Sequence, residues 1–533
     1  MITRSFILIA LFCLLSAPAR TEAMEVLRQY LPGEEAATPA PTPEPEQTPE
    51  PVAEPGPTPE PEPPASQQPP VVRVNVTSQA FNFSQPWRKG TPAIRQGLGV
   101  VLVDGRILVT AELVANHTYV ELEKPETALK APARVEVVDY DANLALLAAP
   151  AADFLQSIPG AKLDESAEVG DRIEIMQLEP NGTPVSTTAV ITTIEVGPYP
   201  VDENAFLVFK LSVPLQSREN SFTVPAFRDG KLVGLLMRYD PRSQTADVVP
   251  APVITHFLQA AAKTPYAGFP RAGLTFSDTR DPQLRRFAKL SNGTGGAYVT
   301  KVLRGSPADE AGIKAGDVLL SVDGRPIDQD GNYEDPRFGK ISLAHYVSTA
   351  LQAGQTIPVV VWRDGAEVTL DATLAPRDRT RMISQPYVFD TAPDFIVAGG
   401  IVFSELSRQF LREWGPRWPG EAPLRLVYLD RFQNELPPDR GKIVFISGVL
   451  STPNTVGYQD LSYEIVEEVN GKPIRSLRDL ADAIDNPDGK FLRIKLAEDP
   501  GVVVLDVEKS KAEEDRIQRE YGLPYLRRLG GED

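Results

Sequence analysis

Residues 97–114 read GLGVVLVDGRILVTAELV, and this stretch decides the class of fold. Two short aliphatic runs, Val100–Val103 and Ile107–Val109, lie on either side of the pair Asp104-Gly105. An Asp-Gly pair between two apolar runs is one of the strongest local signals for a β-hairpin. The stretch therefore predicts two neighbouring strands joined by a tight turn.

The same pattern of short apolar runs between turn-forming residues continues from Val71 to about Lys263. The further runs are Ala133–Val138, Ile173–Met176, Ala189–Ile194, Phe206–Leu211 and Leu232–Met237. Short strands that recur at this spacing are typical of a β-barrel or a β-sandwich. The pattern therefore indicates an all-β domain and leaves both architectures open.

The composition excludes several classes of function. The chain has 533 residues, which is too long for a single hydrophobic core and indicates several domains. Its net charge of −18 argues against general binding to nucleic acid or to anionic membrane surfaces. The one cysteine, Cys13, lies in a segment expected to be removed, and His117, His256 and His345 are far apart in sequence. We therefore expect no disulfide framework, no cysteine nucleophile, no metal centre and no cofactor.

Residues 1–23 have the pattern of a secretory signal peptide. Arg4 precedes an apolar run, Phe6–Leu15, and small residues follow at candidate cleavage sites. The run is shorter than the ~20 residues that span a bilayer. We expect export to the periplasm, the cell envelope or the extracellular space, with no transmembrane helix in the mature chain. An uncleaved anchor is the alternative.

Residues 24–70 are rich in Pro and Glu, as in TPAPTPEPEQTPEPVAEPGPTPEPEPP. Such a segment buries little apolar surface and favours an extended polyproline II conformation. We expect a disordered linker. It serves either as a stalk that holds the globular part away from a surface or as a connection with no partner.

Four segments, in this order, resemble the protease domain of the Deg/HtrA (Do-like) serine proteases. They are Gly97–Leu102, Arg106–Val114, Asn143–Leu147 and Pro225–Leu235. The resemblance extends over residues 71–263. It implies a chymotrypsin/trypsin-like double β-barrel and a family activity of serine endopeptidase.

The catalytic positions depart from the family pattern. Glu112 stands where the resemblance places the general-base histidine, Asn143 where it places the orienting aspartate, and Phe222 where it places the nucleophilic serine. Ser221 lies one residue away, but it has no neighbouring histidine. A serine hydroxyl needs an adjacent base to take its proton, and that base needs an acid to orient it. We therefore expect no intact catalytic residue; a non-triad arrangement in an active endopeptidase is the alternative.

Residues 264–380 resemble a PDZ domain of the Deg/HtrA type, with the signature segments Gly305–Ala308 and Gly316–Gly324. PDZ domains bind a peptide C-terminus as an added strand, and a loop of backbone amides holds the carboxylate. The resemblance places that loop and strand at Ala272, Gly273, Leu274, Thr275 and Phe276, with Gly273 allowing close approach of the ligand. The opposing helix is expected over Leu343–Leu351, where His345 either lines the groove or is a solvated helix residue.

Residues 381–533 resemble a second, more divergent PDZ domain followed by a C-terminal tail. Val469–Ile474 repeats Val322–Ile327 of the first module, and the loop is expected at Gly399, Gly400 and Ile401. This order of domains is similar to the plant-type Deg branch, in which the second PDZ domain mostly serves assembly.

The resemblance implies partners as well as folds. We expect binding to C-terminal peptides or unfolded proteins. We also expect a homo-oligomer, as a trimer or a multiple of it, or a mixed assembly with an active relative. Phe81, Phe83 and Trp87 precede the barrel. These aromatic side chains either pack subunits together or cover the barrel of their own subunit.

The sequence therefore predicts an exported pseudo-protease that binds peptides through its PDZ domains and acts as a scaffold or regulator in envelope protein quality control. The alternatives are an active serine endopeptidase and a purely structural, stalked envelope protein.

Overall fold

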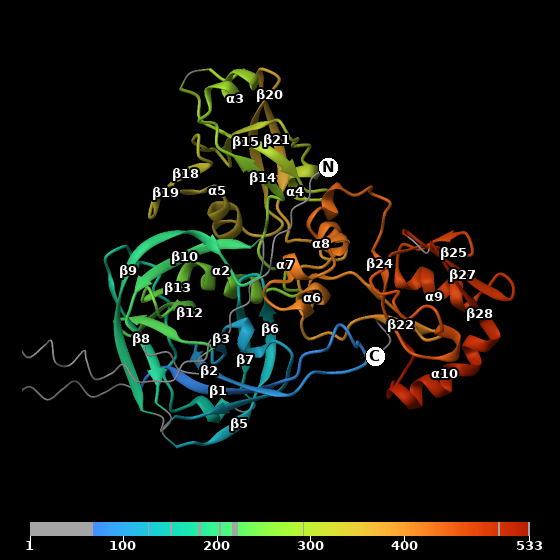
Figure 1. Ribbon diagram of the computed structural model, residues 1–533. Coiled ribbons are helices and arrows are strands. Elements are labelled where there is room, and N and C mark those ends of the chain that lie inside the picture. The colour runs from blue at the N-terminus through green and yellow to red at the C-terminus, as the bar shows by residue number, and fades with distance from the viewer. Residues whose placement is uncertain are drawn as a thin grey trace, which may run out of the picture. The chain divides into compact units, whose positions relative to one another are not determined.

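The computed structural model describes residues 68–125, 127–149, 152–179, 183–201, 204–215, 222–291, 293–498 and 501–530. The expected signal peptide, the expected linker up to residue 67, and Ser221 lie outside these described residues. The described residues belong to one unit, Gln67–Asp533, and Figure 1 shows that strands dominate it.

The first β-domain is a seven-stranded antiparallel sheet with the order β5-β4-β1-β2-β3-β7-β6. Val100 of β2 pairs with Leu108 of β3, which confirms the predicted hairpin. Along β1, the buried residues Val72, Val74 and Val76 alternate with side chains that face outward, as a half-buried strand requires. The strands are β1 Val71–Ser78, β2 Ala93–Val101, β3 Ile107–Val109, β4 His117–Glu123, β5 Lys130–Pro132, β6 Arg134–Asp139 and β7 Leu144–Ala148. The short helix α1, Ala111–Val114, follows β3.

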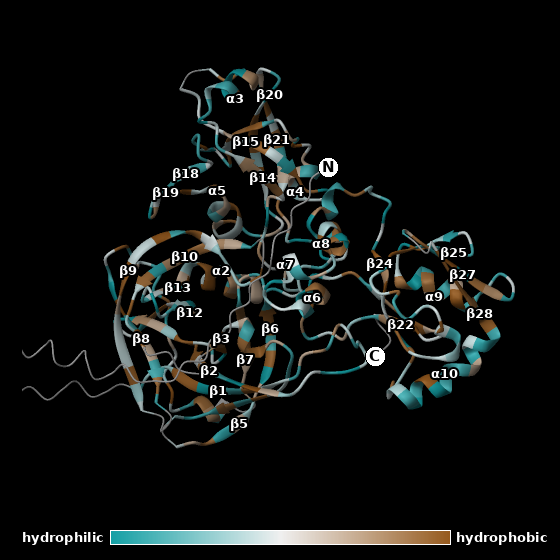
Figure 2. Ribbon diagram, viewed as in Figure 1, coloured by the Kyte–Doolittle hydropathy of each residue, from teal (hydrophilic) through white to brown (hydrophobic). Residues whose placement is uncertain are grey.

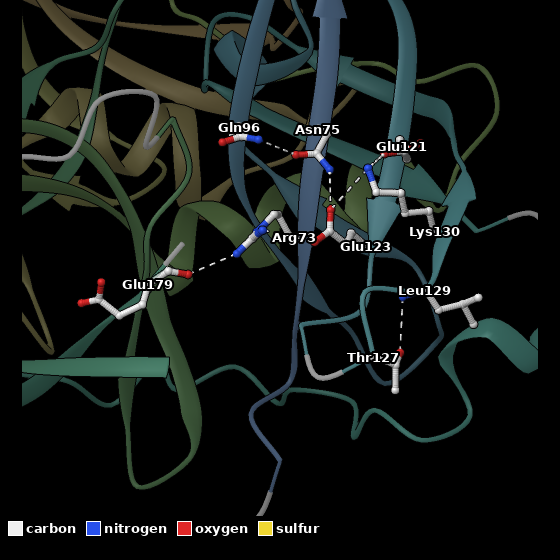
Figure 3. Close-up of polar contacts among 9 residues, drawn as sticks. All are labelled: Arg73, Asn75, Gln96, Glu121, Glu123, Thr127, Leu129, Lys130 and Glu179. Atoms are coloured by element: carbon white, nitrogen blue, oxygen red, sulfur yellow. Dashed lines mark hydrogen bonds and ion pairs between the residues drawn. The ribbon is translucent and has the colours of Figure 1, made fainter. Parts of the chain in front are cut away.

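Polar side chains link the outer face of this sheet (Figure 3). Arg73 Nη1 and Asn75 Nδ2, both on β1, each donate to the Glu123 carboxylate on β4 at 3.1 Å. Gln96 on β2 donates to Asn75 Oδ1 at 2.9 Å. These contacts hold three strands in register on the side that faces solvent.

The second β-domain is a closed barrel with the order β10-β13-β12-β11-β8-β9. Its elements are β8 Arg172–Leu178, β9 Pro184–Pro198, β10 Ala205–Ser212, β11 Pro225–Arg228, β12 Lys231–Asp240, β13 Thr245–Pro250 and the helix α2, Ala251–Ala261. Together with the first sheet it forms the trypsin-like double β-barrel that was expected. The choice of a barrel over a sandwich depends on closure through pairing between β9 and β10, which no local pattern reveals.

The first PDZ module has a sheet with the order β14-β15-β16-β20-β21, and β17 pairs with β16. The strands are β14 Leu274–Ser277, β15 Ala297–Val302, β16 Val318–Val322, β17 Arg325–Pro326, β20 Thr356–Arg363 and β21 Ala366–Thr373; β18 Asn332–Asp335 and β19 Gly339–Ser342 form a separate hairpin. The helices are α3 Pro282–Phe287, α4 Pro307–Glu310, α5 Leu343–His345 and the π-helical η3 Tyr346–Ala350.

The second PDZ module has two four-stranded sheets with the orders β24-β23-β22-β29 and β26-β25-β27-β28. The strands are β22 Phe395–Ala398, β23 Ile401–Glu405, β24 Val444–Val449, β25 Val466–Val469, β26 Lys472–Pro473, β27 Phe491–Leu496, β28 Val502–Asp506 and β29 Arg527–Arg528. The α-helices are α6 Arg408–Leu411, α7 Trp418–Glu421, α8 Leu424–Arg431, α9 Leu477–Asp485 and α10 Val507–Tyr521. Figure 2 shows hydrophobic colour on strands such as β7, whereas α10 is mostly hydrophilic.

The aromatic residues before the barrel pack against the second PDZ module of the same chain, an arrangement that was not among the expected ones. Phe83 is buried in one cluster with Phe410, and the Trp87 and Phe395 ring centroids are 5.9 Å apart. Within the described ranges, no helix is both apolar enough and long enough to cross a bilayer.

Candidate functional site

The structure brings Glu112 and Asn143 together beside the first sheet. Glu112 lies in α1, and its backbone N–H donates to Oδ1 of Asn143 at 3.0 Å. Asn143 is buried and has a left-handed backbone with φ of 55°. Asparagine adopts this conformation more readily than most side chains, because its short polar group can bond locally. Asn143 therefore acts as a cap for the start of α1.

Arg95 on β2 is the residue of this site that sequence reasoning missed. Its Nη1 donates to the carbonyl oxygens of Glu112 at 2.6 Å and Ala115 at 3.1 Å. Its guanidinium also lies over the ring of Phe222, 5.4 Å from the centroid, in a cation–π contact. Arg95 thus contacts both the base position and the nucleophile position, and no motif in the sequence marks it.

The carboxyl group of Glu112 lies in an environment that favours its neutral form. Burial raises the pKa of Glu112 to about 7, while the Asn143 side chain and the Arg95 charge oppose that rise. Glu112 can therefore exchange a proton near neutral pH. Phe222, however, offers it no hydroxyl or thiol to activate.

The segment 222–224 is bound into the neighbouring strands. The N–H of Phe222 donates to the Gln96 carbonyl oxygen, and the N–H of Leu98 donates to the Thr223 carbonyl oxygen, both at 3.0 Å. The N–H of Leu236 donates to the Val224 carbonyl oxygen at 2.8 Å. An oxyanion site needs backbone N–H groups that are free to point at a substrate oxygen. The Phe222 N–H is not free for that role.

Side chains reinforce this pairing. The hydroxyls of Thr110 and Thr223 lie 2.7 Å apart, and Thr110 Oγ1 also donates to the Phe222 carbonyl oxygen at 3.1 Å. A Cβ at Gly97 would lie 2.9 Å from the Thr223 nitrogen, so glycine is needed there for the two chains to approach. The site is therefore packed as a structural junction between β2, β3 and the start of β11.

The first PDZ module places Gly273 immediately before β14, with φ of 76°. Its carbonyl oxygen accepts from the Leu303 N–H at 2.8 Å and from Ser306 Oγ at 3.1 Å. A Cβ at position 273 would overlap Ser306 Cβ. Ser306 of the same chain thus requires glycine at this position. Close approach of a ligand carboxylate to Gly273 stays a prediction.

The expected pairing strand forms as the edge strand β14, which begins at Leu274 and includes Thr275 and Phe276. Leu274 pairs with Val302 on β15, and the other edge of β14 pairs with no strand within the described chain. Ala272 accepts a backbone hydrogen bond from the Ala308 N–H at 3.0 Å, which ties the loop to α4.

The opposing helix forms over Leu343–Ala350, as α5 and η3. His345 is 4% exposed, so the alternative of a solvated helix histidine is wrong. Its ring packs against Phe338 with 5.5 Å between centroids, and burial lowers its pKa to about 4. On the same helical segment, the Thr349 carbonyl oxygen accepts from His256 Nδ1 of α2 at 3.0 Å. The helix is therefore fixed against the second barrel.

In the second PDZ module, Gly399 and Gly400 form the two-residue turn between β22 and β23. Ile401 is fully buried in β23, and the outer edge of β22 is paired with β29 of the C-terminal tail. The expected loop of Gly399, Gly400 and Ile401 is therefore a tight hairpin, with positive φ at both glycines as such a turn demands. It is not an open carboxylate-binding loop.

Comparisons with known proteins agree with this architecture. Family models described as a PDZ domain match residues 270–374 and 384–527. Protease Do-like 2, chloroplastic, from Arabidopsis thaliana is 28% identical over 462 residues, which cover 85% of this chain and 74% of that protein. Putative protease Do-like 13 from the same plant is 26% identical and covers 85% of this chain and 87% of its own length.

These comparisons support the Deg/HtrA family for this chain. Among solved structures, the HtrA-type protease AlgW with decapeptide has 19% sequence identity and a TM-score of 0.45, covering 59% of this chain and 96% of its own. A serine endoprotease from Yersinia pestis has 18% identity and a TM-score of 0.40, covering 58% and 96%. In this chain, the catalytic positions given by the resemblance carry Glu112, Asn143 and Phe222.

Proposed function

We propose that this Deg/HtrA chain is a pseudo-protease. It is exported, it binds C-terminal peptides or unfolded proteins through its first PDZ module, and it acts as a scaffold or regulator in envelope protein quality control. The observation that carries the proposal is the hydrogen bond from the Phe222 N–H to the Gln96 carbonyl oxygen, which incorporates the nucleophile position into a sheet.

Loss of hydrolysis follows from chemistry at three positions. Removing one triad member typically lowers the rate ~10⁴-fold or more, and the members act as a unit. Here Phe222 has no nucleophilic atom, and the Phe222 N–H is already bound. The carboxyl of Glu112 has a suitable pKa for proton exchange but no group to exchange it with.

Peptide binding is supported by the edge strand β14. An extended ligand can add to an unpaired strand edge through main-chain hydrogen bonds, with alternate side chains giving selectivity. The groove is proposed to lie between β14 and the helix of α5 and η3, with Ala272, Gly273 and Leu274 at the carboxylate end, Thr275 and Phe276 along the strand, and His345 at the helix.

The second PDZ module is proposed to serve assembly, because Gly399 and Gly400 form a closed turn and β29 already pairs with β22. The assembly would be a homo-oligomer, as a trimer or a multiple of it, or a mixed assembly with an active relative.

The test of inactivity uses the full chain with unfolded casein and with a fluorophosphonate probe, beside an active serine protease as a positive control. We expect no casein hydrolysis and no labelled serine. Labelling that maps to Ser221, or to any other serine, would support the alternative of an active endopeptidase.

The test of peptide binding uses fluorescent peptides with apolar free C-termini. Micromolar affinity corresponds to ~8 kcal/mol, and amidation of the C-terminus is expected to weaken it tenfold or more. Absence of any C-terminal ligand would favour the purely structural alternative. Binding that is indifferent to amidation would show that the groove of the first PDZ module does not hold the peptide C-terminus.

A further inference from the structure

In the first β-domain, β4 and the segment that contains β5 and β6 pair over a short stretch and then separate. β4 pairs with β5 only through Glu121, Leu122 and Glu123, which lie opposite residues 130–132. Figure 3 shows this paired part, where Lys130 Nζ lies 2.8 Å from Glu121 Oε1. The last link is the hydrogen bond from the Ala133 N–H to the Val120 carbonyl oxygen at 2.9 Å. Beyond it, the chain continues as β6 and no longer pairs with β4.

The two arms beyond this link are His117–Val120 of β4 and Arg134–Val138 of β6. β4 pairs with β1 on its other side, and β6 pairs with β7. Across the 68–125 and 127–149 ranges, no strand pairing joins the two arms, and no other main-chain hydrogen bond does. Apart from the Val120 carbonyl oxygen, the backbone N–H and C=O groups that the arms direct toward each other therefore have no main-chain partner among the described residues.

Irregular pairing explains why the arms separate. The register between β1 and β4 shifts after Thr77, which leaves Thr118 as an extra residue. The register between β6 and β7 shifts after Val135, which leaves Glu136 as an extra residue. Such β-bulges bend a strand and increase its twist, and they often occur next to functional sites. We attribute the separation of the two strands to these bulges.

A hollow of about 470 Å³ lies between the arms. Val114, Val135 and Val138 give it apolar walls, and Tyr119, which is 48% exposed, lies at its rim. The far end is closed by Asp390, whose Oδ1 accepts from the Asn116 N–H at 2.6 Å and whose own N–H donates to Asn116 Oδ1 at 2.9 Å. The hollow is therefore bounded by the Val120–Ala133 link at one end and by Asp390 at the other.

We propose that this hollow binds an extended segment of a non-native polypeptide, which pairs with the arms His117–Val120 and Arg134–Val138 as an added strand. Unpaired main-chain groups are best satisfied by another main chain. An arm of four residues spans roughly 13 Å at ~3.3 Å per residue. A hollow of about 470 Å³ is closer in size to a short extended segment than to a folded domain. Its walls accept apolar side chains at alternate positions.

This site is separate from the groove of the first PDZ module and does not need a free C-terminus. The probe is therefore a fluorescent ten-residue peptide of alternating Val and Thr, with a Lys at each end, an acetylated N-terminus and an amidated C-terminus. A matched peptide carries N-methyl groups on two adjacent central residues, which removes N–H donors from both of its edges. The full chain is used throughout.

We expect the probe to slow hydrogen exchange of those amides in His117–Val120 and in Arg134–Val138 that β1 and β7 leave unpaired. The N-methylated peptide is expected to bind at least tenfold more weakly. Val135→Lys should weaken binding of the unmethylated probe at least tenfold, because it places a charge in the apolar wall. Val169→Lys is the matched control, since Val169 is 59% exposed near the start of β8, and it should leave binding unchanged.

The N-methylated peptide keeps the test decisive even if Val135→Lys fails to fold. Equal binding of the two peptides, or bound probe without a change in exchange in either arm, would overturn the proposal. Slow exchange, before any peptide is added, of those arm amides that β1 and β7 leave unpaired would also overturn it. If that slow exchange is lost when the protein is diluted, a second copy of the chain is the occupant of the hollow. If the slow exchange persists on dilution, a segment of the same chain is the occupant.

Discussion

The backbone N–H of Phe222 donates to the carbonyl oxygen of Gln96, with 3.0 Å between nitrogen and oxygen. Two residues further along β2, the Leu98 N–H donates a hydrogen bond in the opposite direction, to the Thr223 carbonyl oxygen. These reciprocal bonds make residues 222–224 an extension of the sheet. This pairing and the side chain of Phe222 together form the structural basis of the proposed inactivity.

Restoring the triad side chains alone should not restore hydrolysis. We expect the triple variant Glu112→His, Asn143→Asp and Phe222→Ser to be inactive on fluorescent casein, because the Phe222–Gln96 pairing would persist. Replacing residues 220–224 by Gly-Asn-Ser-Gly-Gly in that background is expected to give trace activity. Hydrolysis by the triple variant alone would show that the sheet pairing is not an obstacle.

Glu112 should make the protein less stable as the pH rises. Its folded-state pKa is about 7, above the ordinary value of 4.5. The folded state therefore holds a proton that the unfolded state releases between these two values, so stability is full below pH 4.5 and falls up to pH 7. Glu112→Gln should remove this loss and stabilise the protein at pH 8 by up to about 3 kcal/mol, with little effect at pH 4.

Urea unfolding at several pH values checks the effect of Glu112→Gln. Glu367→Gln, at an exposed position of β21, is the control and should leave the pH profile as it is. An unchanged difference between wild type and Glu112→Gln from pH 4 to pH 8 would contradict the assignment.

Gly273→Ala should destabilise the protein more than Gly354→Ala does. Both glycines have positive φ, 76° and 88°, so both variants incur backbone strain of about 1–2 kcal/mol. Only at Gly273 does the added methyl meet another group, Ser306; nothing lies within 4 Å of a Cβ at Gly354. We expect an extra cost of about 1–3 kcal/mol in urea unfolding. Adding Ser306→Gly should recover part of it, and no recovery would argue against the Ser306 overlap.

Phe83→Ala should lower stability and leave the molecular mass unchanged. The Phe83 ring is 6% exposed and packs in a cluster with Phe410, and deletion of a buried Phe typically costs about 3–5 kcal/mol. Thermal unfolding measures the first effect and light scattering the second. Phe287→Ala is the control, since Phe287 is 74% exposed. A fall in mass with Phe83→Ala would instead support the interpretation that this aromatic residue joins subunits.

Several elements of the fold could be predicted because their signals are local. The β2–β3 hairpin follows from Asp104-Gly105 between two aliphatic runs, and α4 follows from Ser306 and Pro307, which act as N-cap and first helical residue. The sequence predicts a loop at Gly399 and Gly400, and the structure shows that these two glycines make a two-residue turn. The sequence contains the glycines, but only pairing between β22 and β23 shows how they are used.

The amino-acid sequence by itself determined the short strands of the double barrel, the two PDZ modules and the identities of Glu112, Asn143 and Phe222. Those features depend on residue type and on spacing over a few positions. Tertiary structure alone decided that Arg95 contacts Glu112 and Phe222, that Thr110 bonds to the Phe222 carbonyl 112 positions away, and that the arms of β4 and β6 separate around a hollow. The reason is physical: such contacts form when distant segments pack, and they depend on the register and twist of the whole sheet, which no local window of sequence contains.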